Sequence, residues 1–137
     1  MKLLRCYEQI LHQRHGVFSE TLDLALLPSD FLTSVLYQPT KSSHPEWQQW
    51  QEMVDTLDVL VFVIPEYNGS YPGILKAFID ALAFPRSLQG KRAAMIGLSD
   101  GTQGAALGMA HFADVLNYAG AVALPLRPRL IQINRYM

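Results

Sequence analysis

The residues best suited to binding a ligand lie in two short segments, 65–71 and 99–104. The first contains Asn68 and Gly69, which adopt positive φ at low cost and can turn successive N–H groups outward. A loop of this kind, with a tyrosine beside it, suits a flat aromatic ligand with polar edges. A tight turn in which Ser70 caps a following helix is the alternative interpretation. Composition alone does not separate the two.

The other reactive side chains form no recognisable catalytic or metal-binding set. The four histidines lack the spacing of metal ligands, so we expect no metal site. Ser99, Asp100 and His111 follow no nucleophile–base motif. Cys6 lies in a predicted helix, where its simplest role is that of a small packed side chain. We therefore expect no acid–base catalytic residue.

The elements that must position the two segments alternate between helix and strand. Apolar spacings of three and four, with stop residues after them, predict helices over residues 2–13, 45–57, 72–82 and 103–118. Apolar runs and alternation predict strands over residues 18–24, 59–64, 91–98 and 121–124. A polar loop is expected up to residue 43, and Lys76 and Asp80 are spaced for an ion pair on one helix.

This order predicts an α/β fold with a parallel sheet covered by helices on both faces. Residues 59–64, VLVFVI, are uninterrupted and mostly β-branched, so we expect both faces of that strand to be buried. Ligands of such sheets bind beyond the carboxyl ends of the strands, which is where residues 65–71 and 99–104 fall. No repeat or linker interrupts the pattern, so residues 1–137 are predicted to form a single domain.

Composition excludes several classes of protein. The chain has 137 residues, of which 50% are hydrophobic and 17% charged, with a formal net charge of −1. That balance is unlike a nucleic-acid binder, which usually has a basic face. No apolar run approaches the roughly 20 residues that span a bilayer. The single cysteine forms no internal disulfide. We expect a soluble, cytoplasmic protein.

Residues 65–80, PEYNGSYPGILKAFID, closely resemble the signature of the NAD(P)H-dependent FMN reductase family. Residues 99–104, SDGTQG, resemble the second flavin loop of that family, and the similarity covers most of residues 17–125. The resemblance implies a flavodoxin-like, doubly wound sheet, the cofactors FMN and NAD(P)H, and a small-molecule electron acceptor. The cofactor-binding residues that it implies are Pro65, Glu66, Tyr67, Asn68, Gly69, Ser70, Ser99, Asp100, Gly101 and Gly104.

The second loop departs from the family pattern at one position. The family usually has a pair of glycines there, whereas Gly104 is followed here by Ala105. If position 105 needs positive φ, alanine costs about 1–2 kcal/mol. If the position needs only close approach, the methyl group matters less.

The resemblance also implies elements that this chain lacks. Family members begin with a strand and a glycine- and serine-containing loop, which holds the FMN phosphate at a helix N-terminus, and they end with a further helix. We therefore expect a flavodoxin-like domain abbreviated at both ends. An incomplete sequence, a naturally abbreviated relative and a remnant without a flavin role are three explanations.

Two functions follow from these explanations. The first is an NAD(P)H-dependent FMN reductase, which passes hydride from a nicotinamide through FMN to a small acceptor. The alternative is a non-catalytic, oligomeric binding protein that has lost tight FMN binding. In an abbreviated domain, uncovered sheet would expose apolar surface, which favours a homodimer or a higher homo-oligomer.

Overall fold

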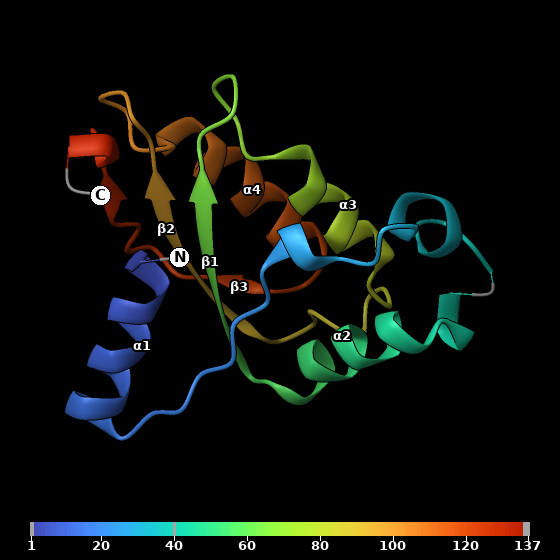
Figure 1. The fold of residues 1–137 in the computed structure, drawn as a ribbon. Helices are drawn as coiled ribbons and strands as arrows, with labels where there is room; N and C mark the ends of the chain where they lie inside the picture. Colours follow the sequence, from blue (N-terminus) through green and yellow to red (C-terminus); the bar gives the residue numbers. More distant parts are fainter. Residues whose placement is uncertain (1, 40, 136–137) are drawn as a thin grey trace.

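Four helices and four strands, with short helical turns between them, build the described part of the chain (Figure 1). The computed structural model describes residues 2–39 and 41–135, and all of their side chains except those of Lys2, Leu3 and Ser42. The helices are α1 (Lys2–His15), α2 (Pro45–Thr56), α3 (Gly73–Ala81) and α4 (Ala106–Tyr118). The strands are β1 (Val59–Pro65), β2 (Arg92–Leu98), β3 (Val122–Ala123) and β4 (Arg129–Leu130). Short turns of helix span Leu24–Leu26, Phe31–Val35, Lys41–Ser43 and Ile133–Arg135.

The sheet is parallel and centres on β2. β1 pairs with β2 from Val59↔Arg92 to Pro65↔Leu98. The opposite edge of β2 pairs with β3 at its amino end and with β4 at its carboxyl end. The segment between β3 and β4 contains Pro125 and Pro128, which have no N–H to give to a ladder. The parallel sheet with intervening helices confirms the predicted α/β fold class.

One face of the sheet carries the main core. Ile64 of β1 and Met95 of β2 are buried there, and Phe62 meets Phe112 of α4 edge-on with ring centroids 4.9 Å apart. Trp47 of α2 is buried as well, and its ring packs against Phe78 of α3. The predicted helices 45–57, 72–82 and 103–118 are confirmed, with no end shifted by more than three residues, so the amphipathic patterns identify this layer correctly.

The opposite face of β1 is partly open. Val59 is 48% exposed and Val61 38% exposed, so the prediction that both faces of this strand are buried is wrong. The reason is that α1, although it forms as predicted, contributes none of its described side chains to the core. Figure 1 shows α1 to one side of the two long strands. Leu3 is one of the apolar residues whose spacing predicts this helix, and its side chain lies outside the described residues.

The predicted strand over residues 18–24 is also wrong. Residues 17–23 form no ladder in the described part of the chain, and a turn of helix begins at Leu24, with Asp23 accepting from the N–H of Ala25 at 3.1 Å. Leu22 and Leu24 nevertheless pack against the core. The alternation of these leucines with polar residues therefore reflects contact with the core. No strand forms, because a strand also needs a neighbouring strand with which to pair.

The stretch expected to be a polar loop up to residue 43 contains helical turns. Phe31 and Val35, on the turn Phe31–Val35, are buried in the core. Because the residues around Phe31 and Val35 are polar, the sequence pattern did not predict the burial of these two side chains. Of the apolar side chains at helical spacing in residues 45–57, Trp47 and Val54 are buried and Trp50 packs against the core. Leu57 follows the helix and is exposed.

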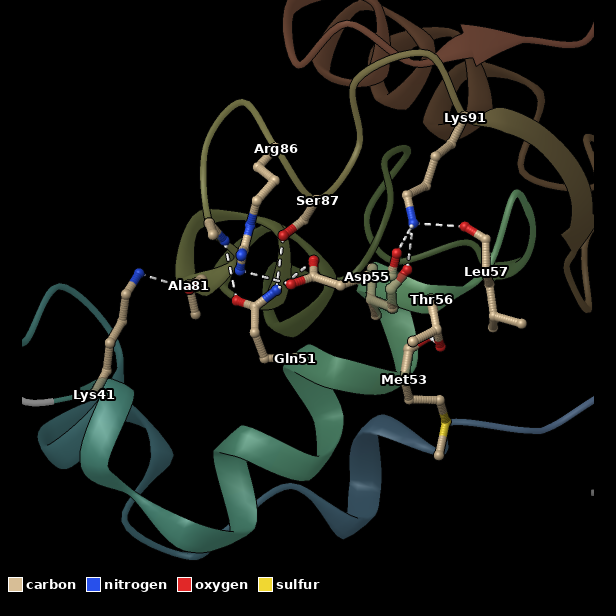
Figure 2. Close-up of polar contacts among 12 residues, drawn as sticks. Lys41, Gln51, Met53, Asp55, Thr56, Leu57, Ala81, Arg86, Ser87 and Lys91 are labelled. Atoms are coloured by element: carbon tan, nitrogen blue, oxygen red, sulfur yellow. Dashed lines mark hydrogen bonds and ion pairs between the residues drawn. The ribbon is translucent and has the colours of Figure 1, made fainter.

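Polar contacts fix the carboxyl end of α2 against the start of β2 (Figure 2). The ammonium group of Lys91 donates to the carbonyl oxygens of Val54 at 2.5 Å, Asp55 at 2.9 Å and Leu57 at 2.5 Å. These carbonyls belong to the last turn of the helix and to the residue that caps it, where carbonyl groups lack the usual intrahelical donors, although that of Val54 also accepts from the N–H of Leu57 at 3.4 Å. A positive charge there also matches the helix dipole. Gln51 accepts from the N–H of Ala83 at 3.0 Å and thereby ties α2 to the segment after α3.

We expect Lys91→Met to lower the free energy of unfolding by about 2 kcal/mol, because it removes a charged donor from three carbonyls. Lys76→Met is the matched control, because Lys76 pairs with Asp80 at 2.6 Å, as predicted, on a partly exposed helix surface. We expect that variant to cost less than about 1 kcal/mol. Urea denaturation measures both, and equal effects would mean that Lys91 does not anchor α2.

The outer edge of β1 gives a second prediction. The N–H of Arg92 donates to Asp58 at 3.0 Å and the N–H of Glu66 to Leu98 at 2.8 Å, so even-numbered residues of β1 direct their peptide groups towards β2. The amides of Val61 and Val63 therefore face the free edge. We expect them to exchange hydrogen at least about tenfold faster than those of Phe62 and Ile64. NMR-detected exchange measures this, and equal protection would mean that the edge is covered.

Candidate functional site

The two segments singled out in the sequence lie together. Residues 65–71 follow β1 and residues 99–105 follow β2, and these strands run parallel in register up to Pro65↔Leu98. Figure 1 shows both loops at the carboxyl ends of the two long arrows. This edge is where the topology predicts a ligand site.

The first loop is a tight two-residue turn. Tyr67 and Ser70 exchange backbone hydrogen bonds of 2.9 and 3.0 Å. Asn68 and Gly69 between them have φ of 50° and 74°, which is the sign that a type I′ turn requires at both central positions. The predicted positive φ of this pair is confirmed. The N–H groups of Asn68 and Gly69 have no partner among the described residues, so both are available to a ligand.

Ser70 does not cap the following helix, so that part of the turn interpretation is wrong. The N-cap of α3 is Pro72, two residues further on, and no side chain bonds there. The hydroxyl of Ser70 lies instead 3.0 Å from Nδ1 of His111 on α4. A Cβ atom at Gly108 would lie 2.8 Å from the carbonyl carbon of Ser70, so the glycine lets α4 approach the loop closely.

The second loop is closed by Ser99. Its hydroxyl accepts from the N–H of Gly104 at 2.9 Å and donates to the carbonyl of Gly101 at 3.1 Å. The N–H groups of residues 100–103 have no partner in the part of the chain that the structure describes. Four successive backbone donors are thus available beside the turn of the first loop.

Gly104 and Ala105 both adopt left-handed backbone conformations, with φ of 58° and 55°. The question left by the sequence is therefore answered, because position 105 needs positive φ. Alanine at such a position costs about 1–2 kcal/mol. The side chain of Ala105 is fully buried at the start of α4.

Glu66 joins the two loops. Its carboxylate accepts from the N–H of Ala105 at 2.9 Å, while its own N–H donates to Leu98 of the neighbouring strand. The side chain is half-buried. Glu66 therefore acts in this structure as a bridge between the loops, and a contact between it and a cofactor stays a prediction.

The segment after β3 supports the second loop, a role that the sequence analysis missed. The N–H groups of Gln132 and Ile133 donate to Gly101 and Ser99 at 3.0 and 3.2 Å. A Cβ atom at Gly104 would lie 2.7 Å from Cβ of Arg129 in β4. The only sign of this role in the sequence is the short apolar run after Pro128. The prolines before that run are typical of an irregular segment, so no strand was predicted there.

The geometry fits the ring of a flavin. The two loops offer unpaired N–H groups, and the polar edge of an isoalloxazine ring can accept hydrogen bonds from such donors. Tyr67 is exposed beside them. The backbone donors of these two loops therefore suit the ring of the cofactor.

Comparisons with known proteins point the same way. Residues 1–127 match the family model described as NADPH-dependent FMN reductase. A 2-hydroxy-1,4-benzoquinone reductase of Burkholderia sp. is 34% identical over an alignment of 112 positions that covers 73% of this chain and 61% of the relative. An NAD(P)H-dependent FMN reductase of Pseudomonas aeruginosa is 36% identical over 74 residues, which are 53% of this chain and 40% of that protein.

Solved structures share the fold. FerB of Paracoccus denitrificans, a flavoenzyme NAD(P)H:(acceptor) oxidoreductase, superposes with a TM-score of 0.76 at 29% identity and covers 96% of this chain and 70% of its own. An NADH:FMN oxidoreductase, EMOB, also reaches 0.76 at 20% identity, with 96% and 67% covered. These likenesses confirm the flavodoxin-like fold.

The chain spans between 29% and 61% of the length of the curated relatives cited above and of two further ones. Among the residues that the structure describes, no helix has both the length and the apolar character needed to cross a bilayer.

The two residues with left-handed backbone conformations, Gly104 and Ala105, should respond differently to substitution. Gly104→Ala adds strain at positive φ and a clash with Arg129, so we expect the free energy of unfolding to fall by about 2–3 kcal/mol. Ala105→Gly relieves strain but loses a buried methyl group and adds freedom to the unfolded chain, so we expect a change within about 1 kcal/mol. Thermal and urea unfolding measure both, and equal losses would contradict the assignment of the two positions.

Proposed function

This chain is a member of the NADPH-dependent FMN reductase family, and we propose that it passes hydride from NAD(P)H through FMN to a small-molecule acceptor. FMN, when bound, supplies the hydride chemistry, so the protein has only to bind and orient the reactants. The observation that carries the proposal is the pair of loops at the carboxyl ends of β1 and β2, which present unpaired N–H groups and are joined by Glu66.

The two loops have different roles in this proposal. Residues 65–70 border the isoalloxazine, and the N–H groups of Asn68 and Gly69 donate to its polar edge. Residues 99–104 line the pyrimidine side of the ring with their backbone donors. The side chain of Glu66 holds the two loops together, and the hydroxyl of Ser99 closes the second loop. Both residues therefore position the backbone donors. No side chain is needed as a general acid or base.

A quinone is the acceptor class that we propose. Two relatives at 34% and 36% identity are named as a 2-hydroxy-1,4-benzoquinone reductase and a quinone reductase. We further propose a homo-oligomer, which the exposed Val59 and Val61 on the open face of the sheet support. A cytoplasmic location is part of the proposal as well, in keeping with the use of NAD(P)H.

Titration of FMN into the purified protein tests the proposal directly. We expect quenching of flavin fluorescence, a yellow complex, and oxidation of NADH or NADPH that requires both FMN and benzoquinone. The reaction without protein is the control. No binding at millimolar FMN would contradict the proposal, and it would favour a non-catalytic binding protein.

The turn at Asn68 and Gly69 allows a sharper test. We expect Asn68→Leu and Gly69→Val each to weaken FMN binding about tenfold, because side chains that resist positive φ distort the turn and its two donors. Asn68→Gly is the matched control, since glycine keeps the backbone conformation and should retain the affinity. Circular dichroism checks that the fold is intact. Unchanged affinity in both strained variants would mean that the loop is only a turn.

A further inference from the structure

The segment that supports the second loop carries positive charge that the chain does not offset. Residues 115–137 contain three arginines and no aspartate or glutamate. The arginines are Arg127, Arg129 and Arg135, and none of them forms an ion pair within the described part of the chain. Three positive charges therefore follow one another along the segment after α4.

Arg129 lies against the second loop. A Cβ atom at Gly104 would come within 2.7 Å of the Cβ atom of this arginine. Nη1 of its guanidinium group lies 3.5 Å from the carbonyl oxygen of Gln103. The other guanidinium N–H groups have no partner among the described residues, and the residue is exposed. The loop thus positions one nitrogen of Arg129 and leaves the others available to a ligand.

Arg135 is attached to the same loop through the turn of helix Ile133–Arg135 (Figure 1). The N–H of Ile133 donates to Ser99 at 3.2 Å, and the N–H of Gln132 donates to Gly101 at 3.0 Å. Arg135 is exposed, and its guanidinium group has no partner among residues 2–39 and 41–135. Two exposed arginines are therefore carried by segments that bond directly to the second loop.

The carboxylates of the two loops do not neutralise these arginines. Glu66 accepts from the N–H of Ala105, and Asp100 is exposed and forms no ion pair with a described residue. By contrast, Arg86, in the segment before β2, pairs with Asp55 at 2.7 Å. Uncompensated positive charge beside a ligand site raises the local concentration of anionic ligands.

Arg127 provides an independent observation on the same segment. Its Nε atom is buried and has no hydrogen-bond partner among the described residues. Buried polar atoms of this kind nearly always have a partner, so an unpaired one requires an explanation. An anion bound beside this segment would supply a counter-charge that the chain itself does not provide.

The reactants of the proposed function narrow down the anion. The backbone donors of residues 99–104 serve the flavin ring in that proposal, so the arginines beside them are left for the second reactant, NAD(P)H. Its nicotinamide has to lie on the flavin, and the rest of the dinucleotide then extends past the loops. Both forms of the dinucleotide carry a pyrophosphate, and NADPH carries a 2′-phosphate as well. Arginine forms paired hydrogen bonds with phosphate oxygens.

We propose that Arg129 and Arg135 bind a phosphate group of NAD(P)H, so that the chain holds the dinucleotide by its phosphates as well as by its nicotinamide. This inference rests on the proposed function, because the dinucleotide is the hydride donor of that reaction. The pyrophosphate and the 2′-phosphate are two sources of the same chemistry, and a comparison of NADP⁺ with NAD⁺ distinguishes them.

Calorimetric titration of the purified full chain, without FMN, tests the site. We expect NADP⁺ to bind more tightly than adenosine, which has no phosphate. Arg129→Gln and Arg135→Gln should each weaken NADP⁺ binding about threefold to tenfold, because each removes a charge together with its paired donors. Arg92→Gln is the matched control, since Arg92 is an exposed arginine at the opposite end of β2, and it should have no effect. Circular dichroism checks folding.

Each outcome of the titration decides the matter. A loss confined to NADP⁺ assigns the arginines to the 2′-phosphate, and an equal loss for NAD⁺ assigns them to the pyrophosphate. NADP⁺ that binds no more tightly than adenosine would overturn the proposal. An arginine variant that behaves like Arg92→Gln would overturn the assignment of that arginine.

Steady-state kinetics with FMN and benzoquinone separate this proposal from the proposed function. We expect both arginine variants to raise KM for NADPH and to leave kcat within about twofold, because they act on binding and not on hydride transfer. The hydride donor 1-benzyl-1,4-dihydronicotinamide has no phosphate, so its oxidation should be unchanged. An equal loss with that donor would overturn the proposal. Oxidation of neither donor would contradict the proposed function, and the calorimetry still decides the role of the arginines.

Discussion

The parallel pairing of β1 with β2 is the constraint on which the rest of the structure depends. Parallel strands end at the same edge, so an unbroken register from Val59↔Arg92 to Pro65↔Leu98 brings the loops after both strands together. Lys91 secures the start of this register, because it holds the last turn of α2 beside the first residue of β2. The site is therefore a consequence of strand alignment, and no residue within either loop could create it alone.

The two loops are held in place by backbone groups more than by side-chain packing. Glu66 spans them by accepting from the N–H of Ala105, which is a donor at the start of α4. For that N–H to face Glu66 the chain passes through two left-handed residues, and the second is alanine. Strain of about 1–2 kcal/mol at Ala105 persists because the surrounding contacts determine the backbone there. Strained residues of this kind concentrate at binding sites.

The sequence predicted those parts of the fold that depend on local periodicity and on long motifs. The helices from α2 to α4, the strands β1 and β2, and the positive φ of Asn68 and Gly69 all follow from patterns within a few residues. The failures depend on distant partners. The open face of β1 arises because α1 does not join the core, and residues 18–24 alternate in polarity without a neighbour to pair with. Likewise, nothing in the residues near Ser70 indicates that its hydroxyl contacts His111.

Helix α4 connects these observations, because it is the element that both loops share. Its first residues follow directly from the second loop, and the close approach at Gly108 together with His111 fixes the first loop. Its inner face is locked by Phe112 and Leu116 in the core, so the helix cannot shift without disturbing the sheet. Because the helix contacts both loops, its fixed position on the sheet also fixes the positions of the loops.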